Sequence, residues 1–138
     1  WLGNKYIHLL SSAEPHELRV DLVAFNGSKA YATYQNFSVG DYDSNYALTV
    51  GAYSGNAGDS LTGHSGAAFS ARDRDLDTWS YSHCATTHHG AWWYTACHSS
   101  NLNGLYKNSA EPGTDGVAWN PWFGWYSLKH TEMKMRPT

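Results

Sequence analysis

The sequence contains no long apolar run and no concentration of positive charge. A membrane-spanning helix requires about 18 or more consecutive apolar residues, and no stretch of the chain approaches that length, so we expect no membrane segment. Lysine and arginine number nine among 138 residues, they are scattered, and the formal net charge is -3. Because there is no basic stripe to neutralise phosphates, we expect no nucleic-acid partner.

Charged residues are scarce altogether, at 15% of the chain, and aromatic residues are equally frequent at 15%. This composition excludes a helical bundle, which needs more alanine, leucine, glutamate and lysine. It is typical of a loop-rich globular protein. At this length we expect a single domain over residues 1–138.

The chain also lacks the motifs of several enzyme classes: it has no G-x-S-x-G elbow, P-loop or dinucleotide-binding fingerprint. Its only two cysteines, Cys84 and Cys97, are either two buried thiols or one disulfide. A disulfide would stabilise the fold by about 3 kcal/mol and would indicate an oxidising compartment. It would also remove the thiolates that a nucleophile or a zinc site needs. We therefore expect no enzymatic activity.

Regular secondary structure is expected mainly in the first 53 residues. Residues 1–11 predict a short helix, with Asn4 as its N-cap and Tyr6, Ile7 and Leu10 on one face. Alternation of apolar and polar residues then predicts strands. The expected strands are residues 17–25, 28–37, 46–53 and 128–135.

The first two of these strands should form a hairpin. Asn26-Gly27 between them predicts a type I′ turn, because both residues tolerate a positive φ. Two Asn-x-Ser triplets are present, and Asn36 is the better glycosylation candidate because Asn26 lies in this turn. From Gly55 onward glycine, serine, asparagine and aspartate dominate, which predicts loops. The expected fold class is α+β: an antiparallel sheet with short helices, followed by a loop-rich half.

Most of the chemistry lies in residues 72–106, which hold both cysteines, half of the eight histidines and three of the seven tryptophans. A second aromatic group occupies residues 119–126. Tryptophan and tyrosine combine an apolar face with a polar edge, which suits sugars. Most of these rings, above all Trp92 and Trp93, are expected in the core.

Asp73, Asp75 and Asp77 alternate with other residues, and such carboxylates can converge on a hard cation such as calcium. The EF-hand pattern does not apply, because Thr78 stands where that loop needs glycine and Cys84 where it needs glutamate. Any further ligands would have to be main-chain oxygens. On spacing alone, a calcium site and a solvated acidic turn are equally supported.

A series of motifs from Trp1 to Pro137 resembles the fibrinogen-related domain, the C-terminal globular domain of fibrinogen chains, ficolins, tachylectins, tenascins and angiopoietins. The motifs are WLGN-x-x-IHLL, ELRVDL, YA-x-Y-x-x-F-x-VG, LTVG-x-Y-SG-x-AGDSL, FS-x-x-DRD-x-D, GAWWY-x-x-CH-x-SNLNGLY, DGV-x-W and YSLK-x-TEMK-x-RP. The resemblance implies a central sheet subdomain followed by a calcium- and ligand-binding subdomain, without the family's N-terminal subdomain. It also implies a secreted, extracellular protein that is a homo-oligomer in its full-length form.

The resemblance implies a calcium site and a disulfide. The family binds calcium through two aspartates just before the disulfide, which correspond to Asp75 and Asp77, and through two main-chain carbonyls. These carbonyls should belong to Trp79 and Tyr81, while Asp73 should lie outside the site. Cys84 and Cys97 should form the disulfide.

The resemblance also places a ligand pocket beside the calcium site. In lectin members this pocket holds an acetyl group, and its floor includes the histidine after the second cysteine, here His98. The Ala96–Cys97 peptide should be cis, and Trp122 should supply an aromatic wall. Two walls depart from the lectin pattern: His88 stands where a tyrosine is frequent, and Gly113-Thr114 replaces Tyr-Ala.

Two functions follow as expectations. One is a calcium-dependent lectin of innate immunity that recognises acetylated glycans or other sugars of bacterial and fungal surfaces. The alternative, favoured by the altered pocket, is an extracellular protein-binding module that acts as a receptor ligand, in matrix adhesion or in fibrin-like assembly. His88 and His98 would switch binding between about pH 5 and 7, whereas His83 and His89 are expected to be structural.

Overall fold

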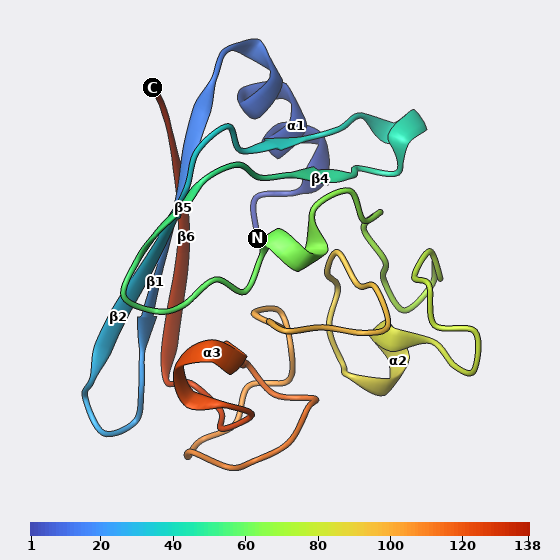
Figure 1. Ribbon diagram of the computed structural model, residues 1–138. Helices are drawn as coiled ribbons and strands as arrows, with labels where there is room; N and C mark the ends of the chain where they lie inside the picture. Colours follow the sequence, from blue (N-terminus) through green and yellow to red (C-terminus); the bar gives the residue numbers. More distant parts are fainter.

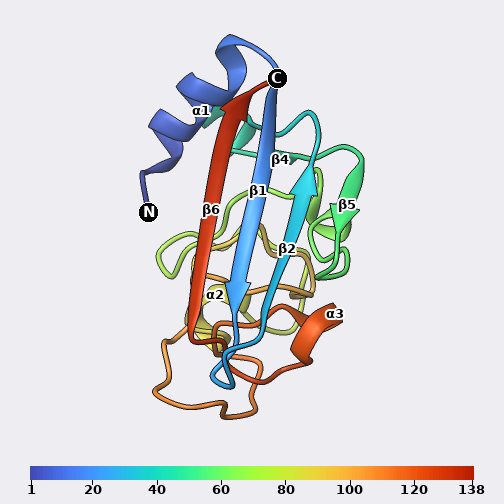
Figure 2. The same ribbon diagram turned by 90° about the vertical axis from the view of Figure 1, so that its left-hand side faces the viewer.

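Two antiparallel sheets form the regular part of the fold in the computed structural model, which describes all residues, 1–138. The larger sheet has the strand order β5-β2-β1-β6, and the smaller one pairs β3 with β4. Strand β6 comes from the end of the chain and pairs along its whole length with β1, from His16↔Pro137 to Val23↔His130 (Figure 1 and Figure 2). The strands are β1 (His16–Val23), β2 (Lys29–Tyr34), β3 (Ser38–Val39), β4 (Leu48–Thr49), β5 (Tyr53–Gly55) and β6 (His130–Pro137).

The remaining half of the molecule is built of loops that cover one face of the large sheet (Figure 1). Only single turns of helix interrupt these loops, as the glycine- and serine-rich composition predicts. They are η2 (Thr62–His64), α2 (Cys84–Thr87) and α3 (Asn120–Phe123), while another single turn, η1 (Tyr42–Ser44), lies earlier between β3 and β4. The expected α+β fold class is confirmed.

Helix α1 (Asn4–Ala13) is the longest helix, and no helix is long and apolar enough to cross a membrane. The prediction that Asn4 is its N-cap was wrong. Gly3 takes that position with a φ of 102°, which glycine adopts without strain. Of the three residues predicted to share a face, Ile7 is buried together with Ser11, whereas Tyr6 and Leu10 are exposed. Ser11 accepts a hydrogen bond from the main chain of β3, which holds this narrow side of the helix against the sheet.

The β1–β2 hairpin forms, but not with the predicted type I′ turn. Gly27 has a positive φ of 89° and Asn26 does not. The Ala24 carbonyl accepts a hydrogen bond from Gly27 N–H, and Ala24 N–H donates to Ser28. The loop therefore has three residues with glycine in the left-handed position, a common hairpin alternative in which only one residue needs a positive φ.

The predicted third strand over residues 46–53 was wrong as a single element. Its two ends join different sheets, since β4 pairs with β3 and β5 pairs with β2. Between them the Gly51 N–H donates to the Gln35 carbonyl, and a Cβ at Gly51 would lie 2.8 Å from that oxygen. This close approach needs glycine and leaves no room for a continuous strand.

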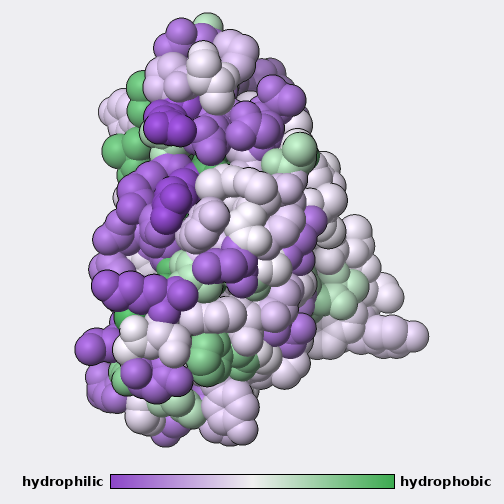
Figure 3. Space-filling view, turned by 60° about the vertical axis from the view of Figure 1, so that its left-hand side comes forward, coloured by the Kyte–Doolittle hydropathy of each residue, from purple (hydrophilic) through white to green (hydrophobic).

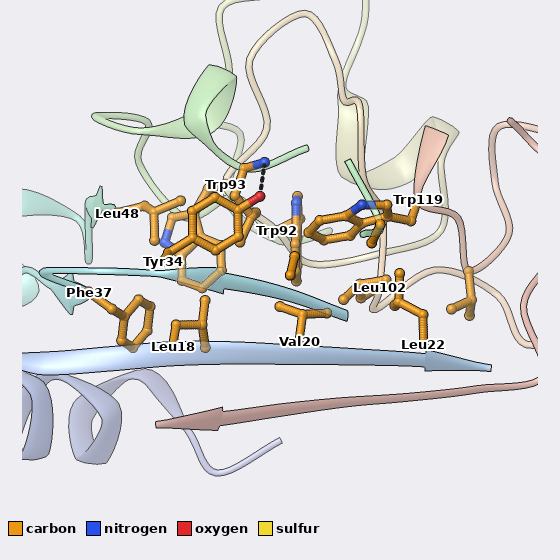
Figure 4. Packing of buried hydrophobic residues seen from close by; sticks show 14 of the residues in the cluster. Leu18, Val20, Leu22, Tyr34, Phe37, Leu48, Trp92, Trp93, Leu102 and Trp119 are labelled. Carbon is orange, nitrogen blue, oxygen red and sulfur yellow. Dashed lines mark hydrogen bonds between the residues drawn. The ribbon is translucent and has the colours of Figure 1, made fainter. Parts of the chain in front are cut away.

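Alternation along the strands separates an apolar face from a charged one. Leu18, Val20 and Leu22 of β1 are buried under the loops, where they meet fully buried tryptophans (Figure 4). Trp92 and Trp93 have no exposed surface, which confirms that they belong to the core. The opposite face carries cross-strand ion pairs, such as Lys134 with Asp21 at 2.7 Å, and it is largely hydrophilic (Figure 3).

The Tyr34 hydroxyl joins the sheet to the loop-rich half. It donates a hydrogen bond of 2.9 Å to Oδ1 of Asp59 and accepts from the N–H groups of Ser60 and Leu61 at 3.1 and 3.2 Å. Tyr34 has no exposed surface, so water cannot replace these partners. Figure 4 shows the ring reaching from β2 across the core to the backbone above it.

We predict that Tyr34→Phe lowers the free energy of unfolding by about 2 kcal/mol, because it leaves buried polar groups without a partner. Tyr31→Phe is the matched control, since Tyr31 lies on the opposite face of β2, and it should change stability little. Urea denaturation of both variants measures the difference. Equal midpoints for the two variants would show that the Tyr34 hydroxyl does not join the halves.

Candidate functional site

The disulfide links the two segments that carry the expected site residues. Cys84 and Cys97 are joined, with an S–S distance of 2.07 Å and Cα atoms 5.6 Å apart, as predicted. Cys84 begins α2, which leads to His88, and Cys97 immediately precedes His98. The Ala96–Cys97 peptide is cis, also as predicted.

The aspartates expected to bind calcium lie in the loop before α2. Oδ1 of Asp77 accepts from Trp79 N–H at 2.9 Å, and Oδ2 accepts from Cys84 N–H at 2.8 Å. Oδ1 of Asp75 accepts from the main-chain N–H of Asp77 at 3.4 Å. The carbonyl oxygens of Trp79 and Tyr81 accept no hydrogen bond within the chain.

These oxygens are of the kind that calcium prefers, two carboxylates and two uncommitted main-chain carbonyls. No group of three or more histidine, cysteine, aspartate or glutamate side chains could hold a metal anywhere in the structure. A cation at this loop therefore depends on main-chain oxygens. This all-oxygen donor set fits calcium and does not fit a structural zinc site, which is built from cysteine and histidine ligands.

Free backbone donors lie next to the disulfide. The N–H groups of Ala96, Cys97 and His98 donate no hydrogen bond within the chain. Those on either side are occupied: Thr95 N–H donates to the Cys97 carbonyl at 2.8 Å, and Ser99 N–H donates to Nε2 of His64 at 3.1 Å. Ala96 is exposed, so this segment can offer its donors to an oxygen atom of a ligand.

Two imidazoles converge beside these donors. Nδ1 of His88 lies 3.0 Å and Nε2 of His98 lies 2.7 Å from the same oxygen, the carbonyl of Thr114. The two rings meet edge to face with centroids 4.8 Å apart. The structure thus brings together three residues that the sequence marked for the pocket.

An aromatic wall completes this group, but Trp125 supplies it. Its ring packs edge to face on His98 with centroids 5.1 Å apart, whereas Trp122 packs on Phe123 at 4.5 Å. Gly124, with a φ of 60°, ends α3 between the two tryptophans and reverses the chain. The sequence shows several tryptophans close together here, and only this turn decides which of them meets His98.

Burial keeps both histidines neutral at neutral pH. It lowers the pKa of His98 to about 4, although the hydrogen bond to Thr114 acts in the opposite direction, and neighbouring His88 and His64 lower it further. Burial also lowers the pKa of His88. The expected switch between about pH 5 and 7 therefore does not hold for His98, which titrates below that range.

The other two histidines of this region have local partners. Nε2 of His83 lies 3.0 Å from the Ala71 carbonyl, and its Nδ1 lies 2.9 Å from the Thr86 hydroxyl. His89 faces the carboxylate of Asp115 at 3.3 Å. Both contacts are consistent with the structural role expected for these side chains.

The residues that converge on Thr114 lie apart from the best-defined apolar hollow of the molecule. This apolar hollow of about 340 Å³ lies between the start of α1 and β6 and is lined by Trp1, Leu2 and Met133 among others. It contains none of the residues that converge on Thr114.

Comparison with known proteins identifies the family. The whole chain, residues 1–138, matches the family described as fibrinogen beta and gamma chains, C-terminal globular domain. The chain belongs to this family. The human protein fibrinogen C domain-containing protein 1 is 51% identical over 99% of this chain, which spans 31% of that protein. Ryncolin-4 of Cerberus rynchops is 47% identical over 99% of this chain, which spans 40% of it.

Solved structures agree with this assignment. The fibrinogen-like globe domain of human ANGPTL6 is 41% identical with a TM-score of 0.96, and this chain covers 64% of that structure. A lamprey fibrin D-dimer complexed with the peptide ligand Gly-His-Arg-Pro-amide is 34% identical with a TM-score of 0.94. This chain covers 50% of the fibrin structure and therefore corresponds to part of these relatives.

We predict a pH dependence of stability that originates at His98. Its pKa in the fold, about 4, is below the value of 6.5 in the unfolded chain, so the unfolded state binds the proton first as the pH falls. The stability due to neutral His98 is present above pH 6.5 and is lost between pH 6.5 and 4. Wild type should lose about 3 kcal/mol over this interval relative to His98→Gln, whose amide can still donate to Thr114.

Denaturation of both proteins at a series of pH values measures this difference. His64 and His88 are present in both proteins, so the comparison isolates His98 together with its coupling to these two neighbours. Parallel curves would contradict a buried, neutral His98.

Proposed function

We propose that this chain is a calcium-dependent lectin module that binds acetylated glycans at the surface around His98. The observation that carries the proposal is the row of free N–H groups at residues 96–98 beside the neutral His98 and Trp125 rings. The free donors suit a carbonyl oxygen, and the rings suit the methyl group and the C–H face of a sugar. The absence of catalytic motifs and the family membership support a binding module and not an enzyme.

Calcium would act on this surface through the protein. Asp75, Asp77 and the carbonyls of Trp79 and Tyr81 would hold the ion. Asp77 also accepts from the Cys84 N–H at the start of α2, and the Trp79 ring faces His88 with centroids 6.3 Å apart. The ion would therefore order the residues that position His88 without touching the ligand.

A second candidate is a module that binds a protein or peptide at the same surface. It is favoured by His88, which stands where lectin relatives often have tyrosine, and by the related fibrin structure, whose bound ligand is a peptide. The outcome of the glycan experiment below separates the two candidates.

In either case we propose an extracellular setting, which the disulfide supports. One such site binds a single sugar weakly, so high avidity would require several copies of the module. The recognition of bacterial or fungal surfaces in innate immunity would follow from such an assembly.

We predict that beads carrying N-acetylated chitosan retain the protein in calcium and release it on addition of chelator or N-acetylglucosamine. Fully deacetylated beads, the matched control, should not retain it, because they lack the carbonyl that residues 96–98 require. Equal retention on both kinds of bead would contradict acetyl recognition. A lack of retention combined with binding to a cell-surface protein would favour the peptide-binding candidate.

Calcium binding itself is tested by stability. Calcium at about a hundred times its Kd should raise the free energy of unfolding by about 2.7 kcal/mol. Asp75→Asn should remove most of this gain, whereas Asp73→Asn, outside the expected site, should keep it. Thermal denaturation with and without calcium measures both variants, and an equal gain in the two would place the ion elsewhere.

A further inference from the structure

The Thr114 carbonyl determines which hydrogen-bonding group His88 presents to a ligand. A carbonyl oxygen only accepts hydrogen bonds, so the nitrogen that faces it must carry a proton. In His88 this nitrogen is Nδ1, at 3.0 Å. A neutral imidazole has a single N–H, and Nε2 of His88 is therefore an acceptor.

The loop that carries Thr114 is held on both sides. After it, Lys107 Nζ binds Oδ1 of Asp115 at 2.7 Å with only 13% of the lysine side chain exposed, and the Asp115 carbonyl accepts from Leu105 N–H at 2.9 Å. Before it, Gly113 N–H donates to the Trp125 carbonyl at 3.0 Å. The position of the Thr114 oxygen is therefore fixed independently of the two histidines.

His88 is held from the other direction. Its main-chain carbonyl accepts from Nδ2 of Asn101 at 3.0 Å, and the same nitrogen donates to the Gly116 carbonyl at 3.1 Å. Asn101 has no exposed surface, so this bridge between His88 and the Thr114 loop is protected from water. The His88 ring also lies near the rings of Trp79 and Tyr94, with centroids 6.3 and 6.5 Å away. Rotation of the imidazole would break its bond to Thr114.

We propose that His88 makes this surface selective for N-acyl amides, such as N-acetylated amino sugars, over O-acyl esters and free carboxylates. The inference rests on the acetyl-binding function proposed above. The free N–H groups of residues 96–98 donate to the acyl oxygen, and Nε2 of His88 accepts the amide N–H. An ester offers the same oxygen but no N–H, and a carboxylate brings a second acceptor toward the lone pair of Nε2.

This selectivity is a property of histidine at position 88. A tyrosine hydroxyl, which lectin relatives often have there, both donates and accepts, and so would not distinguish an amide from an ester by this contact. Histidine held by Thr114 presents an acceptor only. Histidine in place of tyrosine at position 88 thus restricts the ligands to N-acyl amides and does not abolish the site.

The test compares two sugars that differ only in the acyl linkage. Calorimetric titration at pH 7.5 in calcium would use methyl 2-acetamido-2-deoxyglucoside and methyl 2-O-acetylglucoside. Wild type should bind the amide about fivefold more tightly, the effect of one neutral hydrogen bond. His88→Phe, which keeps a ring but has no acceptor, should bind both sugars equally. His130→Phe, a change at an exposed histidine of β6, should keep the wild-type preference.

The outcomes separate this inference from the proposed function. Equal affinity of wild type for the two sugars, or a preference that persists in His88→Phe, would overturn the inference alone. Failure of wild type to bind either sugar would overturn the proposed function and the inference together. A second measurement needs no ligand: nitrogen NMR should show the His88 proton on Nδ1, and a proton on Nε2 would overturn the inference.

Discussion

The burial of three tryptophans against one face of the sheet holds the two halves of this chain together. Trp92, Trp93 and Trp119 have no exposed surface, and they come from segments that are mostly loop. They meet the apolar side of β1, so the loop-rich half is anchored by side chains and not by a ladder of backbone hydrogen bonds. Truncation of a buried aromatic residue typically costs about 3–5 kcal/mol, so each anchor is a large part of the stability of one domain. Two of these indole rings are also fixed in orientation by hydrogen bonds. The Trp93 N–H donates to the Tyr46 carbonyl and the Trp119 N–H donates to the Gly58 carbonyl, both at 2.9 Å.

This anchoring explains how a site can be ordered with so little secondary structure. The segment that carries residues 96–98 follows directly on Trp92 and Trp93, and α3 with Trp125 follows directly on Trp119. The two segments that form the candidate site, residues 96–98 and Trp125, therefore each follow a fully buried tryptophan in the chain. The disulfide then fixes the first of these segments to α2, and the hydrogen bonds of Asn101 fix α2 to the loop that carries Thr114.

The electrostatics of this surface suit hydrogen bonding and not proton transfer. His88 and His98 are both neutral at neutral pH, and both use an N–H group on the Thr114 carbonyl. Asp115 is occupied by Lys107 and His89, which keep the pKa of its carboxyl low. The unpaired polar groups are main-chain donors on one side and imidazole nitrogens on the other, Nε2 of His88 and the buried Nδ1 of His98. Such an arrangement recognises a neutral polar ligand by complementary hydrogen bonds.

The sequence by itself determined the fold class and the strands whose alternation is strict, and the family resemblance added the pairing of the cysteines. β1, β2 and β6 could be predicted because residues of period two must place one set of side chains in the core. The family motifs further marked His88, His98 and Thr114 as neighbours, which the structure bears out. The prediction of one strand over residues 46–53 was wrong. A composition rich in β-forming residues does not show that the backbone of Gln35 passes close to Gly51 and divides the strand.

Only the tertiary structure decided which groups of the candidate site are free. Trp125 replaces Trp122 beside His98 because a glycine turn reverses the chain, and nothing in the spacing of the tryptophans indicates that turn. The pKa of His98 falls because rings from distant segments bury it. The Thr114 carbonyl holds both imidazoles because Asn101 and Lys107, in the segment that precedes the loop, fix the loop at Gly116 and Asp115. The local sequence specifies the chemical type of each side chain. The protonation state and the free hydrogen-bonding groups of that side chain depend on the residues that the fold packs around it.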